Sequence, residues 1–253
     1  MRKFLKYNTI GKEEIKAVQK VMKSGVLSKF LASPGKDFFG GKFVKKFEKS
    51  IKSYFNVKYA ITVNSWTSGL IASVGSLDVE PGDEIIVTTW TMCASATAIL
   101  HWNCIPVFAD IDPDTYNICT KSIEKNITNK TKAIMTVDIF GQSCDILQIM
   151  KIAKRYNLKV ISDSAQSIGS KVNKKYSGTI ADIGGYSLNY HKHINTGEGG
   201  IIVTNNKRLY ERASLIRNHA EASVEKYNKK DLSNMIGHNF RLGEIESAIG
   251  IEQ

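Results

Sequence analysis

Short apolar runs alternate with segments of helical periodicity through most of this 253-residue chain. The runs that indicate strands are rich in Val and Ile and nearly unbroken: 59–63, 84–88, 105–110, 132–137, 158–163, 182–188 and 199–204. Helical spacing of apolar residues fills the intervals at 67–75, at 93–102, near Lys121 and at 145–157. Such an alternation predicts an α/β fold of three layers, in which a mostly parallel sheet carries helices on both faces.

The same periodicity predicts helices near both ends of the chain. The expected helices are 12–24, 44–55, 207–217 and 242–253, with an irregular stretch at 27–41 between the first two. Gly25 ends the first helix. The last helical pattern reaches Gln253 without a capping glycine, a proline or a polar tail, so we expect this chain to lack a C-terminal region.

Composition narrows the classes of function. No apolar run approaches the roughly 20 residues that a membrane helix needs, and the first residues turn polar too early for a signal peptide, so we expect a cytoplasmic protein without a membrane partner. The four cysteines show no metal-ligand spacing, and we predict no metal. The net charge of +11 comes from lysines scattered along the chain, which indicates a basic surface suited to a phosphorylated small molecule and no nucleic-acid partner.

One lysine and one aspartate stand where a cofactor site would need them. Lys192 lies in SLNYHKHINTGEGG, between a short strand and a glycine-rich return, and Asp163 ends an apolar strand upstream. A lysine amine can condense with the aldehyde of pyridoxal 5'-phosphate, and a carboxylate can pair with its pyridinium nitrogen. The alternatives are a surface lysine and a helix-capping aspartate. His191 and His193 flank the lysine and are interpreted as exposed loop residues, although they could tune the site.

Residues that could bind the rest of such a cofactor occur in the same order. After the strand 59–63, NSWTSGL turns into a helix whose first amides, those of Trp66 and Thr67, would point at an anion. Ser187 could reach the same phosphate, and Gln166 could hydrogen-bond near the ring hydroxyl. Each residue has an ordinary alternative: a capped helix start, a strand serine and a polar loop residue.

Taken together, these motifs resemble a known family. The chain is similar to the DegT/StrS sugar aminotransferases, pyridoxal-phosphate enzymes of fold type I, in an ordered set of segments: NSWTSGL, PVFADIDPDTYNI, DIFGQSCDI, ISDSAQSIGS, YSLNYHKHINTGEGGIIVT and HNFRLGEIESAIGIEQ. The resemblance runs from the helix at Lys12 onward. It implies an aspartate-aminotransferase-like large domain over 41–253, preceded by an N-terminal helix and substrate-side loop over 1–40, with the C-terminal small domain absent.

The resemblance also implies roles for single residues. Lys192 matches the Schiff-base lysine, Asp163 the partner of the pyridine nitrogen, and Gln166 the residue beside it. The phosphate-binding positions match Trp66, Thr67 and Ser187.

Asn239 matches an asparagine that reaches the cofactor phosphate of the neighbouring subunit, which implies a homodimer. The chain departs from the family pattern at two site positions. Trp66 replaces the usual glycine or alanine, and Met92 aligns with an aromatic residue that stacks on the cofactor. A thioether can pack on a ring face but is a softer platform, so Trp90 or Trp66 could share the stacking.

Three functions follow from this reading. The first is transamination from glutamate, the amino-acid donor, to a nucleotide-linked keto-sugar, in surface polysaccharide or amino-sugar biosynthesis; a cyclitol is an alternative acceptor. The second is dehydration of a sugar. Family members that catalyse this reaction carry histidine at the position of the lysine, so the presence of Lys192 argues against it. The third is a truncated cofactor-binding or regulatory relative with weak activity. The sequence does not name the sugar, the nucleotide or the carbon that receives nitrogen.

Overall fold

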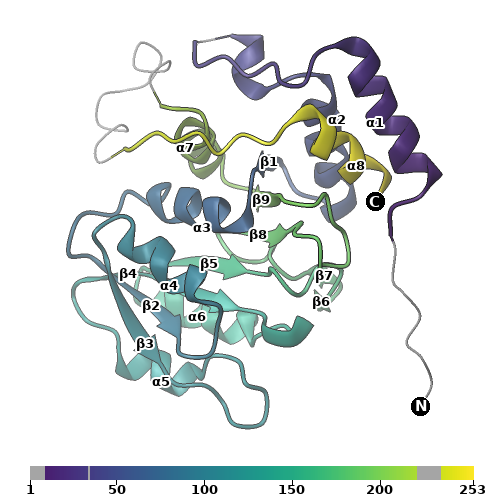
Figure 1. Cartoon of the computed structure of the whole chain (residues 1–253). Coiled ribbons are helices and arrows are strands. Elements are labelled where there is room, and N and C mark those ends of the chain that lie inside the picture. The colour runs from purple at the N-terminus through teal and green to yellow at the C-terminus, as the bar shows by residue number, and fades with distance from the viewer. Residues whose placement is uncertain (1–8, 34, 221–234) are drawn as a thin grey trace, which may run out of the picture.

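In the computed structural model, which describes residues 9–33, 35–220 and 235–253, seven strands form one sheet in the order β1-β9-β8-β5-β4-β2-β3 (Figure 1). The strands are β1 (Tyr59–Val63), β2 (Glu84–Thr88), β3 (Ile105–Ala109), β4 (Thr131–Val137), β5 (Lys159–Asp163), β8 (Ile183–Ser187) and β9 (Gly200–Thr204). Strands β8, β5, β4, β2 and β3 pair in parallel, whereas β9 pairs antiparallel with both of its neighbours, β8 and β1. The predicted mostly parallel sheet is confirmed.

Helices cover both faces of this sheet, as the sequence predicted. The helices are α1 (Lys12–Ser24), α2 (Lys42–Phe55), α3 (Trp66–Gly75), α4 (Cys93–Leu100), α5 (Thr120–Lys125), α6 (Ile146–Arg155), α7 (Lys207–Arg217) and α8 (Glu244–Glu252). Two short 3-10 turns, η1 (Lys36–Phe39) and η2 (Ile139–Gly141), and a hairpin of β6 (Lys171–Val172) and β7 (Lys175–Tyr176) complete the described elements.

Adjacent strand residues divide the core into two layers, because successive side chains of a strand point to opposite faces. Ile85 packs in a cluster with apolar residues of α3, α4 and α7, whereas the next residue, Ile86, packs with those of α5 and α6. On the same side as α5 and α6, Phe47 of α2 packs over the other end of the sheet, against residues of β1 and β9. The sheet is therefore buried on both faces.

Helices α1 and α8 pack together and lie on the outer side of α2 (Figure 1). Glu244, the first residue of α8, is buried and accepts hydrogen bonds from the amides of Phe43 (2.8 Å) and Val44 (3.4 Å). This carboxylate caps α2 at its positive end. The helix consequently begins at Lys42, two residues before the start that its apolar pattern predicted. Within the described ranges, no helix is both long and apolar enough to cross a bilayer.

A buried ion pair joins three elements on the α2 side of the sheet. Glu48 Oε1 accepts from Arg217 Nη1 at 2.7 Å, and from the amide and hydroxyl of Thr62 at 2.9 and 3.1 Å. The Arg217 side chain is 1% exposed and also donates to the Thr62 carbonyl. Helices α2 and α7 are thus tied to β1 by one carboxylate.

We predict that Glu48→Ala lowers the free energy of unfolding by about 3–5 kcal/mol, because it leaves the Arg217 guanidinium buried without a counter-charge. Urea unfolding followed by circular dichroism measures the loss. Glu124→Ala is the matched control: it breaks a pair with Arg155 whose side chains are 58% and 34% exposed, and should cost below about 1 kcal/mol. Equal losses in the two variants would contradict the assignment.

Candidate active site

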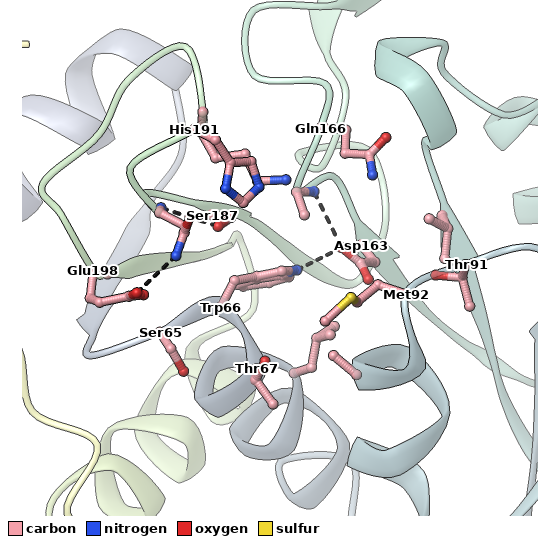
Figure 2. A pocket seen from close by; sticks show the side chains of 17 residues that line it. Ser65, Trp66, Thr67, Thr91, Met92, Asp163, Gln166, Ser187, His191 and Glu198 are labelled. Atoms are coloured by element: carbon pink, nitrogen blue, oxygen red, sulfur yellow. Dashed lines mark hydrogen bonds between the residues drawn. The ribbon is translucent and has the colours of Figure 1, made fainter. Parts of the chain in front are cut away.

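A cavity of about 250 Å³ opens where three neighbouring parallel strands end (Figure 2). The last residues of β4, β5 and β8, namely Val137, Asp163 and Ser187, all line it, together with the start of α3 and the residues before and within the first turn of α4. Ligands of open α/β sheets bind at this edge, beyond the carboxyl ends of the strands. The cavity therefore lies where the fold predicts a binding site.

Asp163 is the buried charge of the cavity, with an exposed fraction of 4%. Its Oδ1 accepts from the indole Nε1 of Trp66 at 2.6 Å and from the amide of Ala165 at 3.2 Å, and its Oδ2 accepts from Ser95 Oγ at 2.8 Å. Burial raises the pKa of this carboxyl, and the hydrogen bonds from Ser95, Trp66 and Ala165 oppose that rise. Donors from α3, α4 and the turn after β5 therefore converge on one carboxylate.

Lys192 lies in the turn after β8 and lines the same cavity as Asp163. Its amide donates to the carbonyl of Asn189 at 2.8 Å, which fixes the backbone of the turn. Partial burial lowers the pKa of the Lys192 amine, and the negative charge of Asp163 opposes that shift. A larger fraction of this amine is therefore neutral, and nucleophilic, at a given pH than for an ordinary lysine.

The amino end of α3 supplies the cavity with a positive helix terminus. Ser65 is the N-cap residue, and its Oγ accepts from the amide of Ser68 at 3.1 Å. Ser65, Trp66 and Thr67 line the cavity, and Ser187 faces it from β8. The first amides of an α-helix have no partner within the helix, so this end can bind an anion.

The structure places the other predicted residues as follows. Gln166 lines the cavity, and its Oε1 accepts from the amide of Phe140 at 2.7 Å. Met92 also lines it but is 68% exposed, so it lies at the rim. His191 contributes to the lining, whereas His193 and Trp90 lie outside the lining set.

Asn239 does not line this cavity either. Its side chain is on the surface and its Oδ1 accepts from Arg241 Nε at 2.8 Å. The role of Asn239 at a neighbouring subunit therefore stays a prediction.

Sequence reasoning missed one residue that lines the cavity and one buried residue that donates to its carboxylate. Ser95 is fully buried in α4 and donates to Asp163, but a serine inside an Ala-rich helix gives no local signal of such a bond. Glu198 lines the cavity and accepts from Asn189 Nδ2 at 2.8 Å. The GEGG segment that drew attention to Lys192 contains this carboxylate, so its acidic residue was the available signal.

Comparison with known proteins identifies related chains. The model of the DegT/DnrJ/EryC1/StrS aminotransferase family matches residues 8–253. A GDP-perosamine synthase of Escherichia coli O157:H7 is 41% identical over 213 residues, which are 84% of this chain and 57% of that protein. The chain thus spans little more than half the length of this curated relative.

Two solved structures share the fold along nearly all of this chain. The aminotransferase from Psychrobacter cryohalolentis superposes with a TM-score of 0.87 at 30% identity, covering 99% of this chain and 63% of that one. An E. coli GDP-4-keto-6-deoxy-D-mannose-3-dehydratase with bound hydrated PLP gives a TM-score of 0.84 at 28% identity, covering 97% of this chain and 65% of that one.

The electrostatic interaction between Asp163 and Lys192 predicts how the pKa of Lys192 changes in the Asp163→Asn variant. The carboxylate of Asp163 raises the pKa of Lys192, so its removal lowers that pKa further and increases the neutral fraction of the amine below the pKa. Limiting acylation across a pH series, read by mass spectrometry, should show faster labelling of Lys192 in the variant. Exposed Lys16 of α1 is the internal standard in each digest. Unchanged labelling of Lys192 would show that the two groups do not interact.

Proposed function

Because this chain belongs to the DegT/DnrJ/EryC1/StrS aminotransferase family, we propose that it binds pyridoxal phosphate and transfers an amino group from glutamate to a keto-sugar linked to a nucleotide. The observation that carries the proposal is the presence of Lys192, Asp163 and the amino end of α3 around one cavity. A nucleophilic amine, a buried carboxylate and an anion site are the three groups that this cofactor requires.

The donor set fits the cofactor group by group. Asp163 receives the pyridine N–H, since its carboxylate is buried among neutral hydrogen-bond donors and gains from a positive partner. The amino end of α3, with the Thr67 hydroxyl and Ser187, which also line the cavity, would hold the phosphate. Gln166 and Met92 would lie beside the pyridine ring of the cofactor. When bound, the cofactor supplies an aldehyde for amines and a ring that withdraws electrons from the adjacent carbon.

Lys192 has two tasks in this proposal. Its neutral amine, favoured by partial burial, first anchors the cofactor. The same Nζ, when it is not engaged with the aldehyde, could accept and return a proton at the substrate carbon. A lysine with a lowered pKa suits both tasks, because proton transfer is most efficient when the pKa lies near the working pH.

The substrate class rests on the relatives. The E. coli relative is named for GDP-perosamine, a nucleotide-linked sugar, which supports a nucleotide-sugar acceptor and a place in amino-sugar or polysaccharide biosynthesis. The basic net charge of +11 favours an anionic diphosphate. The division into residues 1–40 and 41–253, the homodimer and the cytoplasmic location belong to the same proposal.

A sugar dehydratase is the second candidate. The fold matches the E. coli dehydratase at a TM-score of 0.84, and the His191 side chain lines the cavity beside Lys192. A histidine in this position could move a proton without anchoring the cofactor. Product analysis separates the two reactions, because transamination retains nitrogen in the sugar and dehydration does not.

We expect Lys192→Ala to abolish borohydride-stable attachment of pyridoxal phosphate and the transfer of labelled nitrogen from glutamate to a panel of nucleotide-linked keto-sugars. Lys121→Ala, an exposed lysine of α5, is the matched control and should behave like the parent chain. Peptide mapping by mass spectrometry locates the attached cofactor. Stable attachment in the Lys192→Ala chain would refute the lysine assignment.

The subunit role of Asn239 predicts complementation. Chains carrying Lys192→Ala and chains carrying Asn239→Ala should each bind the cofactor poorly, whereas their mixed dimers should contain one intact site and regain binding. A mixture of Lys192→Ala with Asp163→Asn is the control, because these two residues belong to the same cavity and no mixed site is intact. Refolding from mixed unfolded chains and titrating the cofactor absorbance gives the measurement. Equal recovery in both mixtures, or none in either, would contradict the role.

A further inference from the structure

The side chain of Trp66 makes a contact with Asp163 that the proposed function leaves unused. Its Nε1 donates to Asp163 Oδ1 at 2.6 Å, the shortest of the three hydrogen bonds to that carboxylate in the described part of the chain (Figure 2). We propose that Trp66 is the positioning residue of Asp163: its indole N–H occupies Oδ1, so that Oδ2 is the oxygen presented to a ligand N–H. This inference rests on the proposed function and names the oxygen that would receive the pyridine nitrogen.

The indole of Trp66 fits where it lies because two neighbouring residues, Gly69 and Gly185, have no side chain. Trp66 is 5% exposed, and a Cβ built on Gly185 of β8 would lie 2.3 Å from its ring, while one built on Gly69 of α3 would lie 2.5 Å from it. Both distances are shorter than any van der Waals contact, so only glycine at 69 and 185 leaves room for the ring as it lies. A ring fixed by a strand and a helix can hold its N–H on one target.

Counting acceptor sites shows which oxygen remains. An ionised carboxylate offers about four lone-pair sites, two on each oxygen. Oδ1 accepts from Trp66 and from the amide of Ala165, which fills it. Oδ2 accepts from Ser95 Oγ, which leaves one site on this oxygen among the contacts of the described residues.

The donor on Oδ2 is itself oriented. Ser95 Oγ lies 2.8 Å from Thr91 Oγ1 as well as 2.8 Å from Asp163 Oδ2. Because Ser95 has one hydroxyl hydrogen and gives it to the carboxylate, Thr91 donates to Ser95. Thr91 and Asp163 both line the cavity, so this chain of hydroxyls connects the cavity lining at Thr91 to Oδ2 through the buried Ser95.

The donors to Oδ1 and the donor to Oδ2 also favour the charged form of Asp163. Burial raises the pKa of this carboxyl, and the hydrogen bond from Trp66 is among the contacts that lower it. Without the indole N–H the carboxyl would become protonated at a higher pH. A protonated carboxyl gives up its charge interaction with a pyridinium ring, so the contribution of Trp66 should grow as the pH falls.

The first test needs no cofactor. In chains labelled with ¹⁵N at tryptophan, the indole signal of Trp66 should shift with pH as Asp163 titrates, and Asp163→Asn should abolish that shift. Trp102 provides the control signal, since it is 2% exposed and its Nε1 donates at 2.8 Å to the carbonyl of Ile71. A Trp66 signal that titrates identically in the parent and in Asp163→Asn overturns the proposal, whatever the cofactor does.

The second test compares Trp66→Phe with Trp102→Phe by titrating each with pyridoxal phosphate. Both variants keep a ring and lose one buried N–H, but only the first removes a donor from Asp163. We expect Trp66→Phe to bind the cofactor about tenfold or more weakly, as for a lost hydrogen bond to a charged group, with the deficit increasing at lower pH. The pH dependence of the bound-cofactor absorbance should shift in this variant alone.

The outcomes separate the two hypotheses. Equal, pH-independent affinities of the two variants overturn the positioning role while leaving the proposed function intact. A parent chain that binds no pyridoxal phosphate, although its Trp66 signal titrates with Asp163, overturns the proposed function and with it the ligand-directing role. If Trp66→Phe does not fold, the indole titration in the parent and in Asp163→Asn still decides whether Trp66 and Asp163 are coupled.

Discussion

The site depends on the burial of one negative charge. Asp163 ends β5 with 4% of its surface exposed, and a carboxylate in that position is costly unless donors surround it. Those donors come from the first turns of α3 and α4 and from the turn after β5. The requirement to satisfy Asp163 therefore fixes how two helices approach the carboxyl edge of the sheet, and their amino ends are the walls of the cavity.

Burial in the same cavity also sets the chemistry of Lys192. Removing an amine from water lowers its pKa, and the nearby carboxylate limits the shift. The neutral donors around Asp163 keep its charge available without neutralising it, which a lysine or arginine in place of Trp66 would not do.

Local patterns predicted the fold closely, and non-local contacts explain what they missed. The bounds of β1, β2 and α7 follow from apolar periodicity alone, and Lys192 and Asp163 were placed in one cavity from their positions at strand ends. The start of α2 could not be predicted, because its cap is a carboxylate of α8. The hydrogen bond of Ser95 could not be predicted for the same reason, because its partner, Asp163, is on another element.

Trp66 shows a further limit of sequence reasoning, since one residue can hold two roles. Its backbone amide lies at the amino end of α3, where the sequence predicted an anion site, whereas its side chain reaches Asp163 and needs gaps at Gly69 and Gly185. A large ring at this position is possible only with glycine at both of those sites, so the three residues form one physical unit. If Trp66 were replaced by a small residue, the glycines would leave a void that water could enter, and Asp163 would exchange a fixed donor for a mobile one. The indole is therefore better understood as part of the carboxylate's hydrogen-bond shell than as a platform for stacking.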